Sequence, residues 1–242
     1  MSRAAATRIL IVALVFVTMS PDLNAADARM QIDHILIGIN DLDQGIAEFE
    51  KATGVRPVYG GKHPSGTHNA LISLGAGRYL EIIANQPNAS DWVELNAFRH
   101  LTPVGWAIST TDVGATRAQL AASGLATNEP RAGSRVTLSG STLSWNTFSL
   151  LEETEEAPFF IAWSSDSPHP STTSPSGCNL VKWQVRAPAS DSLVRLQGLL
   201  GAAFELLSER EIQFRLELRC PKGNVVFESP PAARDLSSRG HG

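Results

Sequence analysis

The sequence lacks any excess of positive charge. Its 242 residues contain 20 Lys and Arg against 24 Asp and Glu, which gives a formal net charge of −4. Domains that bind nucleic acid usually carry a basic patch and a high isoelectric point. Charged residues make up only 18% of the chain, where about a quarter is usual, and this favours a chain rich in sheet. We therefore expect no nucleic-acid partner.

Cysteine and the best-known catalytic motifs are also scarce. The chain has two cysteines, Cys178 and Cys220, and no C-x-x-C, so neither a redox motif nor a zinc ribbon is expected. The two could form a disulfide in an exported protein, although nothing in their spacing requires it. There is no G-x-S-x-G nucleophile elbow and no G-x-x-x-x-G-K-[ST] phosphate loop. Serine-hydrolase and P-loop chemistry are therefore disfavoured.

Long apolar runs are missing except near the start of the chain. The run at residues 9–17 is too short to span a membrane comfortably. Arg3 and Arg8 precede it, and Ala26-Asp27-Ala28 follows as a small-x-small cleavage site. This layout is typical of a secretory signal peptide.

We therefore predict a leader over residues 1–28 and a periplasmic or secreted protein, with no membrane contact after cleavage. An uncleaved membrane anchor is one alternative. Translation from Met30, which leads directly into the first expected strand, is another and would leave the protein in the cytoplasm.

A strand–cap–helix pattern recurs along the chain. Gly54, Gly124 and Gly201 each end one such helix. Further strands follow each glycine, so the pattern predicts a βαβββ unit that is used twice in full and a third time in shorter form. We predict an α+β fold with a first module at 30–90, a second at 91–165, a mobile Ser- and Pro-rich loop at 166–178, a partial third module at 179–229 and a disordered tail at 230–242.

The first unit contains charged residues inside apolar strands. His34 and Glu81 each lie in the middle of such a strand, while His63 and His68 bracket a turn. A buried carboxylate needs a partner because burying it alone is costly. Two histidines and a carboxylate on short strands could form a divalent-metal site. Equally, a histidine and a glutamate could simply satisfy each other.

These residues also carry a resemblance. The Asp33-His34 pair, the segment GGKHPSGTHNALISLG at 60–75 and YLEII at 79–83 together resemble the glyoxalase-like branch of the vicinal oxygen chelate superfamily. The resemblance runs from about Gln31 to Trp163. It implies two βαβββ modules whose curled sheets enclose a cup. In many members of the superfamily a divalent metal is held there by a His on the first strand and a Glu on the fourth strand of each module.

Transferred by position, the resemblance makes His34 and Glu81 metal ligands, but the second module has neither a His on its first strand nor a carboxylate on its last. His68 could complete the ligand set for Mn, Fe, Zn or Ni, or could only fasten its turn. With Glu81 engaged as a ligand, His68 or His63 would serve as the general base. His169, in the predicted loop, could fold over the cup or be an ordinary exposed residue.

Several other side chains are candidates for binding the substrate. Trp106, Trp145 and Trp163 lie on expected strands of the second module, where they could form a stacking wall or pack in the core. Asn69 is a further candidate for substrate binding, and Arg78 and Arg135 could either meet an anionic substrate or be ordinary surface arginines.

The resemblance implies a metal-assisted isomerase, lyase or dioxygenase-type enzyme that acts on a small oxygenated molecule. The alternative is a metal-free protein that sequesters an aromatic or amphiphilic ligand in the same cup. A third reading is an interaction module that keeps the fold without the site. Two chains could also join as a homodimer to complete the cup.

Overall fold

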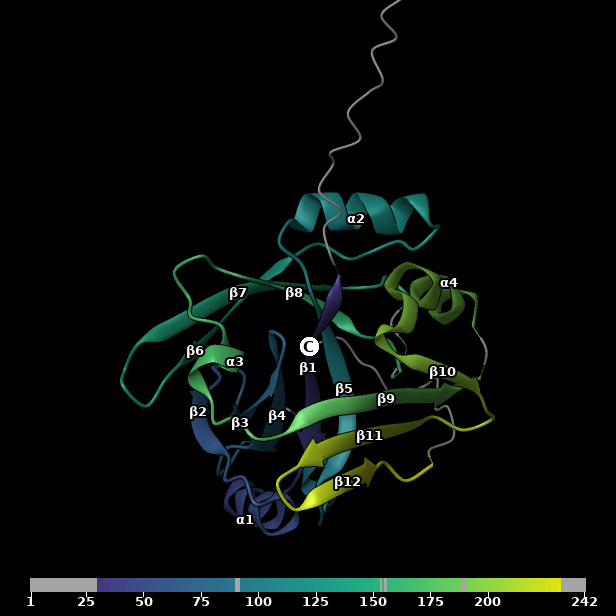
Figure 1. Cartoon of the computed structure of the whole chain (residues 1–242). Coiled ribbons are helices and arrows are strands. Elements are labelled where there is room, and N and C mark those ends of the chain that lie inside the picture. The colour runs from purple at the N-terminus through teal and green to yellow at the C-terminus, as the bar shows by residue number, and fades with distance from the viewer. Residues whose placement is uncertain (1–29, 90–91, 153, 155, 189, 232–242) are drawn as a thin grey trace, which may run out of the picture.

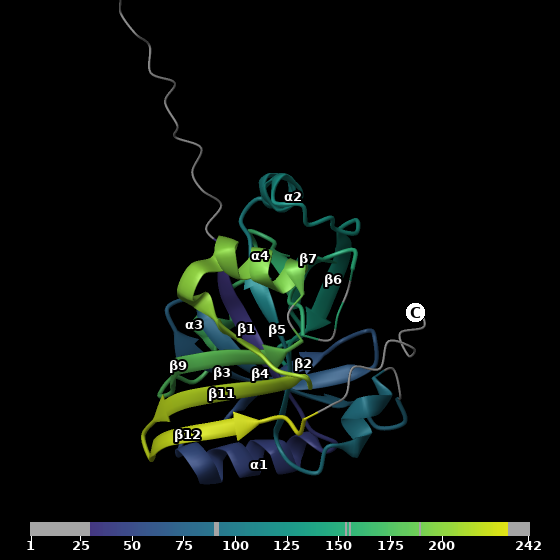
Figure 2. The same ribbon diagram turned by 90° about the vertical axis from the view of Figure 1, so that its right-hand side faces the viewer.

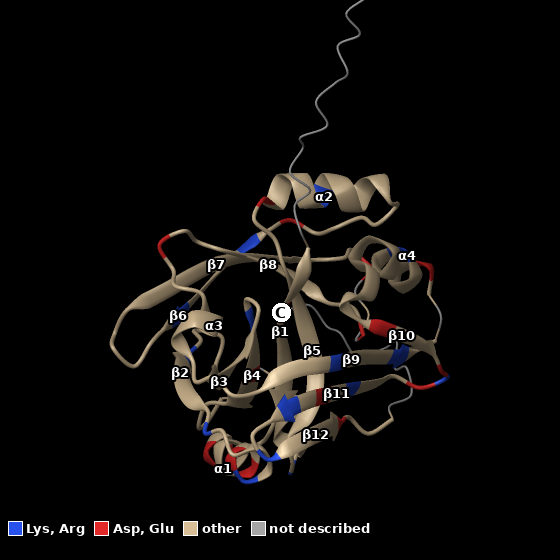
Figure 3. Cartoon of the chain, in the orientation of Figure 1, with Lys and Arg blue, Asp and Glu red and all other residues tan. Residues whose placement is uncertain are grey.

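A computed structural model describes residues 30–89, 92–152, 154, 156–188 and 190–231. The predicted leader and most of the predicted tail lie outside these ranges. None of the helices in the described part of the chain has the length and apolarity needed to cross a membrane. Acidic and basic residues are interspersed along the outer elements, including α1 (Leu42–Thr53), as the ribbon colours of Figure 3 show.

Eight strands form one closed barrel in the order β1-β4-β3-β2-β6-β7-β8-β5 (Figure 1). A mixed α+β fold with a large curled sheet was predicted, and this is confirmed. One chain closes the barrel by itself, so no second chain is needed to complete it. The strands are β1 (Gln31–Gly38), β2 (Val58–Lys62), β3 (Thr67–Gly75), β4 (Arg78–Asn85), β5 (Thr102–Ser109), β6 (Arg131–Val136), β7 (Thr142–Ser149) and β8 (Phe159–Trp163).

Helices cover the outside of the barrel and begin at capping residues. The Asp41 carboxylate accepts the Gln44 backbone N–H at 3.0 Å at the start of α1, which ends at Gly54 with φ +80°. α1 buries Ile46 and Phe49 against the barrel. A short 3-10 helix (Val93–Ala97) links β4 to β5, and α2 (Val113–Ala122) links β5 to β6.

The barrel has two halves, β1–β4 and β5–β8, and they meet along two seams that differ in the number of paired residues. β1 and β5 pair over most of their length. β2 and β6 are joined by a single residue pair, Lys62 and Val136. Gly60 lies beside this second seam, and a Cβ there would clash with Arg135 and with the side chain of Asn69. Glycine therefore allows side chains from the two halves to approach each other at this point.

The third segment forms a separate four-stranded sheet in the order β10-β9-β11-β12, which crosses the barrel near β5 and α1 (Figures 1 and 2). It has a strand, a helix and three more strands, as the sequence pattern of this segment predicts. The origin of the three segments in one repeated module stays a prediction. The elements are β9 (Asn179–Ala187), α4 (Asp191–Leu200), the 3-10 turn Gly201–Ala203, β10 (Glu205–Ser208), β11 (Gln213–Cys220) and β12 (Gly223–Glu228).

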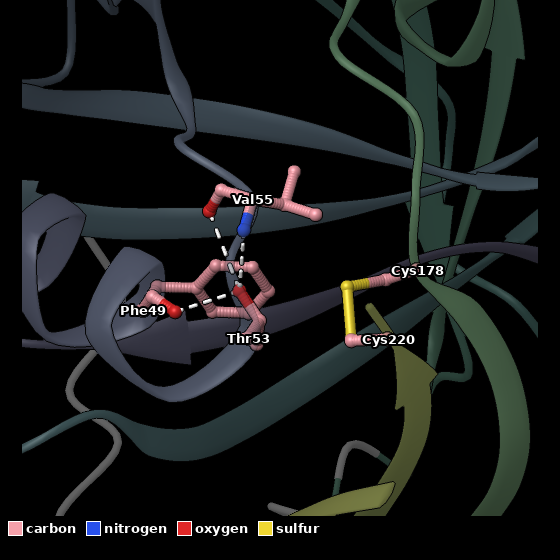
Figure 4. Close-up of a disulfide and its surroundings, with 5 residues drawn as sticks. All are labelled: Phe49, Thr53, Val55, Cys178 and Cys220. Atoms are coloured by element: carbon pink, nitrogen blue, oxygen red, sulfur yellow. Dashed lines mark hydrogen bonds between the residues drawn. A yellow bond between two sulfur atoms is a disulfide. The ribbon is translucent and has the colours of Figure 1, made fainter. Parts of the chain in front are cut away.

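A disulfide between Cys178 and Cys220 joins the start of β9 to the end of β11 (Figure 4). Next to it, the backbone N–H of Lys222 donates to the Thr53 carbonyl at 3.2 Å. The Thr53 hydroxyl in turn donates to the Phe49 carbonyl at 2.7 Å at the end of α1. These bonds tie the second sheet to the helix that covers the barrel.

The predicted mobile loop packs against the barrel instead. Its middle forms the short helix α3 (Pro170–Thr173). The Ser73 backbone N–H donates to the Pro175 carbonyl at 2.8 Å, and the Ser144 backbone N–H donates to the Ser167 hydroxyl at 2.9 Å. The segment is therefore held to both halves of the barrel.

Candidate functional site

A cavity of about 420 Å³ lies between the two halves of the barrel. Side chains that alternate along β1, β3 and β4 line one side of it, and residues of β6, β7 and β8 line the other. Its lining combines polar and ionisable side chains with apolar and aromatic ones. The polar and ionisable lining residues are His34, His63, Ser65, Thr67, Asn69, Tyr79, Glu81 and Arg135; the others are Leu36, Ile83, Trp92, Trp145, Phe159, Ile161 and Trp163.

The Asp33 carboxylate lies behind the cavity wall with no exposed surface. Asp33 Oδ1 lies 2.7 Å from His34 Nδ1, and Oδ2 lies 3.1 Å from His169 Nε2. Trp163 Nε1 also donates to Oδ1, at 3.4 Å. Burial by itself would raise the pKa of Asp33, but the hydrogen bonds from His169 and His34 outweigh it and lower that pKa. Asp33 is therefore an ionised acceptor that holds His34 Nδ1–H in place.

His34 and Glu81 are brought together inside the cavity. His34 Nε2 lies 3.5 Å from Glu81 Oε2, and Asn69 Nδ2 donates to Glu81 Oε1 at 2.7 Å. The Tyr79 ring stacks on the imidazole at 4.5 Å between centroids. With Nδ1–H committed to Asp33, a neutral imidazole would turn a lone pair toward the carboxylate. The imidazole and the carboxylate are thus close neighbours inside the cavity, and together they offer an acid–base pair to a bound molecule.

His63 stands next to this pair. Its Nδ1 lies 2.8 Å from the Thr67 hydroxyl, and its Nε2 lies 3.9 Å from Glu81 Oε1. Burial lowers the pKa of His63, although the Glu81 charge opposes this shift. The imidazole is therefore neutral at neutral pH. Its edge also contacts the Trp145 ring, at 6.1 Å between centroids.

Arg135 reaches the cavity from the second half of the barrel. It is 3% exposed, and burial lowers its pKa while the Glu81 charge opposes that shift. An arginine keeps its charge in proteins even so. The site thus combines an acid–base pair from β1 and β4 with a guanidinium from β6.

Comparison with known proteins assigns the chain to a family. A model of the glyoxalase-like domain matches residues 32–200, which is more than half of the chain. The chain belongs to the glyoxalase-like domain family. The predicted resemblance to glyoxalase-like proteins is thereby confirmed. Among curated proteins, no relative matches this sequence.

Solved structures with a similar arrangement include a hypothetical protein from Staphylococcus aureus. It has a TM-score of 0.56 and 16% identity over 83% of this chain and 85% of its own. A methylmalonyl-CoA epimerase from Mycobacterium tuberculosis has a TM-score of 0.41 and 16% identity over 59% of this chain and 91% of its own. The epimerase from Streptomyces coelicolor, in complex with 2-nitronate-propionyl-CoA, has a TM-score of 0.39 and 19% identity over 57% and 97%.

Three side chains predicted for the site of this glyoxalase-like domain lie elsewhere. His68 stands on β3 between Thr67 and Asn69, which both line the cavity, so its side chain is on the other face of the barrel wall. Burial lowers its pKa, and the charges nearest to it are those of Lys62, Asp43 and Asp41. The predictions that His68 is a metal ligand and a general base are therefore corrected.

Trp106 and Arg78 also lie outside the cavity. Trp106 Nε1 donates to the Glu156 carbonyl at 3.0 Å, and the indole packs on Trp183 and Phe204 in the core. Arg78 lines a separate hollow beside β9 and α4. Their predicted role in substrate binding is corrected on these grounds. Trp145, Trp163 and Asn69, which were predicted for the same role, do line the cavity.

The predicted divalent-metal centre does not fit this donor set. Within the described ranges, no three His, Cys, Asp or Glu side chains are placed so that they could hold a metal ion. The second half of the barrel offers Phe159, Trp163 and the cationic Arg135 to the cavity. A fixed guanidinium repels a divalent cation in the same cavity.

Sequence reasoning missed the roles of Asp33 and Tyr79. In the sequence, Asp33 stands out only as part of the Asp33-His34 motif, although a carboxylate next to a histidine in a buried strand can orient that imidazole. Tyr79 lies two residues before Glu81 on β4, so strand alternation places it on the same face. Burial, together with the charges of Glu81 and Asp33, raises the pKa of Tyr79 well above its ordinary value. Its ring therefore acts as a neutral wall beside His34.

Proposed function

We propose that this glyoxalase-like domain binds a small oxygenated molecule in the barrel cavity and moves a proton at one of its carbon atoms. Such a step is common to isomerases and lyases. The observation that carries the proposal is the buried contact between His34 and Glu81, supported from behind by Asp33. Acid–base groups that converge in a cavity with aromatic walls are typical of catalytic sites.

The pair can act on a carbon atom next to a carbonyl group. The Glu81 carboxylate accepts the proton as the C–H bond breaks, and the electron pair moves to form an enol or enolate. The proton returned to the carbonyl oxygen, or to the carbon from the other side, comes from the pair with His34. Asn69 holds the carboxylate in place through its 2.7 Å bond throughout. The aromatic lining limits water around the developing charge.

Proton exchange with solvent tests the proposal. The chain is incubated in D₂O with carbon acids that carry a carbonyl next to the exchanging carbon, beginning with phenylpyruvate, and exchange is followed by proton NMR. We expect wild type to accelerate exchange and Glu81→Gln to lose about 100-fold or more of that acceleration. The matched control is His68→Gln, which changes a histidine on the outer face of the same barrel wall.

A metal-free binding protein is the second candidate function. The aromatic lining of the cavity, with Trp145, Phe159 and Trp163 on one side, favours an apolar ligand whether or not a reaction follows. Ligands that bind in the cavity without any wild-type proton exchange across the panel would favour this candidate. Exchange that depends on Glu81 would exclude pure sequestration.

A metal-assisted reaction, with Mn, Fe, Zn or Ni, is the more specific form of the function predicted from the sequence. Elemental analysis of protein purified in the presence of each metal tests it directly. Stoichiometric metal that is lost in both His34→Ala and Glu81→Ala, with the fold intact, would support that form. Proton exchange that is unchanged by chelators would support the metal-free chemistry proposed above.

Export to the periplasm or outside the cell is also proposed. Its support is the disulfide between Cys178 and Cys220, since disulfides persist mainly in oxidising compartments. Mass spectrometry of the mature protein tests this proposal. Loss of residues 1–28 is expected, and a chain that begins at Met30 with free thiols would contradict it.

A further inference from the structure

Arg135 is a buried cation without a protein partner. Its side chain lines the cavity and is 3% exposed. Across the described residues, its guanidinium makes neither a hydrogen bond nor an ion pair, and Glu81 contributes only a longer-range attraction. The strand arrangement fixes this placement, because β6 meets β2 at Val136 and the missing side chain of Gly60 makes room for the guanidinium.

A buried and unpaired guanidinium is unfavourable unless an anion binds to it. Guanidinium groups are almost always paired when they are buried, because desolvation penalises an isolated charge. The planar guanidinium matches the two oxygens of a carboxylate in a bidentate contact. A ligand that enters the cavity therefore gains most if it carries an anionic group at the Arg135 end.

The other walls of the cavity determine which chemical groups suit the part of the ligand that does not contact Arg135. Trp145, Trp163 and Phe159 surround the space with aromatic surface. Arg135 is the one Lys or Arg side chain among the described residues that line the cavity, and the Glu81 carboxylate lines the same cavity. A monoanion is consequently preferred over a dianion, and an apolar or aromatic body suits the walls.

We propose that the substrate is a small carboxylic acid with an apolar or aromatic body, whose carboxylate binds Arg135 and whose adjacent carbons face His34 and Glu81. The inference rests on the proposed function, since it uses the same cavity. It assigns different tasks to the two halves of the barrel. β6 provides the binding group, and β1 with β4 provides the acid–base pair.

Calorimetric titration with a matched pair of unreactive probes tests the inference. 3-Phenylpropanoate and 3-phenylpropanamide have the same body and differ in charge. Wild type should bind the carboxylate at least about tenfold more tightly than the amide. Arg135→Gln should lose this preference while amide binding changes little. Arg135→Lys should keep part of it, and Arg78→Gln, which removes an arginine outside the cavity, should keep all of it.

Several outcomes would overturn the inference. Equal binding of acid and amide to wild type would do so, as would a preference that survives in Arg135→Gln, or no binding of the acid at millimolar concentration. Tighter binding of phenethyl phosphate than of the carboxylate would overturn the choice of a monoanion. Circular dichroism of each variant confirms that it is folded before titration.

The titration separates this inference from the proposed function. Arg135-dependent binding of the acid, with no Glu81-dependent proton exchange, would keep the inference and remove the reaction. Glu81-dependent exchange with equal binding of acid and amide would keep the reaction and remove the inference.

Discussion

Asp33 determines which ring nitrogen of His34 carries the proton in the neutral imidazole. Its two oxygens accept from His34 and His169, and it is fully buried. An ionised acceptor on Nδ1 leaves only Nε2 of His34 free to face Glu81. One carboxylate behind the wall therefore selects the tautomer in front of it, as orienting carboxylates do for functional histidines elsewhere.

His63 gives the site a pH dependence that can be measured as stability. Burial lowers its pKa in the folded chain, whereas an unfolded histidine titrates near about 6.5. The unfolded state therefore binds more protons below that pH. The stabilising contribution of a neutral His63 is fully present above about pH 6.5 and is lost as the pH falls toward the lower folded pKa.

We expect His63→Gln to flatten the loss of unfolding free energy between about pH 6.5 and pH 5. Urea unfolding of wild type and variant at several pH values measures this difference. His100→Gln is the control, because the His100 side chain is exposed on the surface. Parallel pH profiles for wild type and His63→Gln would show that His63 does not contribute.

At the level of single residues, the sequence identified the central pair but not all of its surroundings. His34 and Glu81 stand out because each is charged within an apolar strand. His68 was misjudged because neighbouring residues on a strand face opposite sides, and the sequence does not show whether 68 or Asn69 turns inward. Pairing sets the inward face: Leu71 lies opposite Glu81, so Asn69 joins it two residues away.

Helix α3 and the residues around it make the connector between the barrel and the second sheet part of the site. His169 precedes α3, and its Nδ1 lies 2.7 Å from the Ser171 hydroxyl. Its Nε2 thereby faces Asp33, which is 136 residues away along the chain. The connector thus supplies one of the hydrogen bonds to the Asp33 carboxylate, and His169 acts as a positioning residue.

His169→Ala should lower kcat for proton exchange about tenfold and change KM little. The physical reason is that Asp33 loses one donor, so its hold on His34 weakens, while the walls that bind the substrate stay in place. His169→Asn, which keeps a side-chain N–H, should restore part of the activity. Thr173→Ala in the same helix is the control. A change in KM alone would contradict the positioning role.

Some elements could be predicted from local sequence, and others depend on distant pairings. The capping residue Asp41 and the terminal Gly54 predict α1 directly. The closed barrel depends on the pairings of β1 with β5 and of β2 with β6, which join residues far apart in sequence. The packing of the connector was missed for the same reason, since Ser, Thr and Pro composition describes only local preference.

The second sheet and the disulfide stabilise the molecule as a whole. Trp183 of the second sheet packs on Trp106 of the barrel, so the two sheets share one core. The disulfide closes a loop between residues 42 positions apart. A cross-link of that span restricts the unfolded chain and typically stabilises the fold by about 2–4 kcal/mol.

Replacing both Cys178 and Cys220 with serine should therefore lower the unfolding free energy by about 2–4 kcal/mol. Proton exchange per folded molecule should be retained, because neither cysteine lines the cavity. Urea unfolding of the oxidised wild type and of the double variant measures the effect. Reduced wild type should match the variant, and an unchanged midpoint would contradict the assigned role.

The central claim is that Asp33, His34 and Glu81 act as one acid–base unit, in which Asp33 orients His34 and His34 faces Glu81 across the cavity. Nitrogen-15 NMR of the histidine side chains tests it most directly, with or without a substrate. At neutral pH, His34 should carry a proton on Nδ1, and its Nε2 signal should shift in Glu81→Gln while that of His68 stays unchanged. A neutral His34 that is protonated only on Nε2 would contradict the account. So would an Nε2 signal that is the same in wild type and in Glu81→Gln.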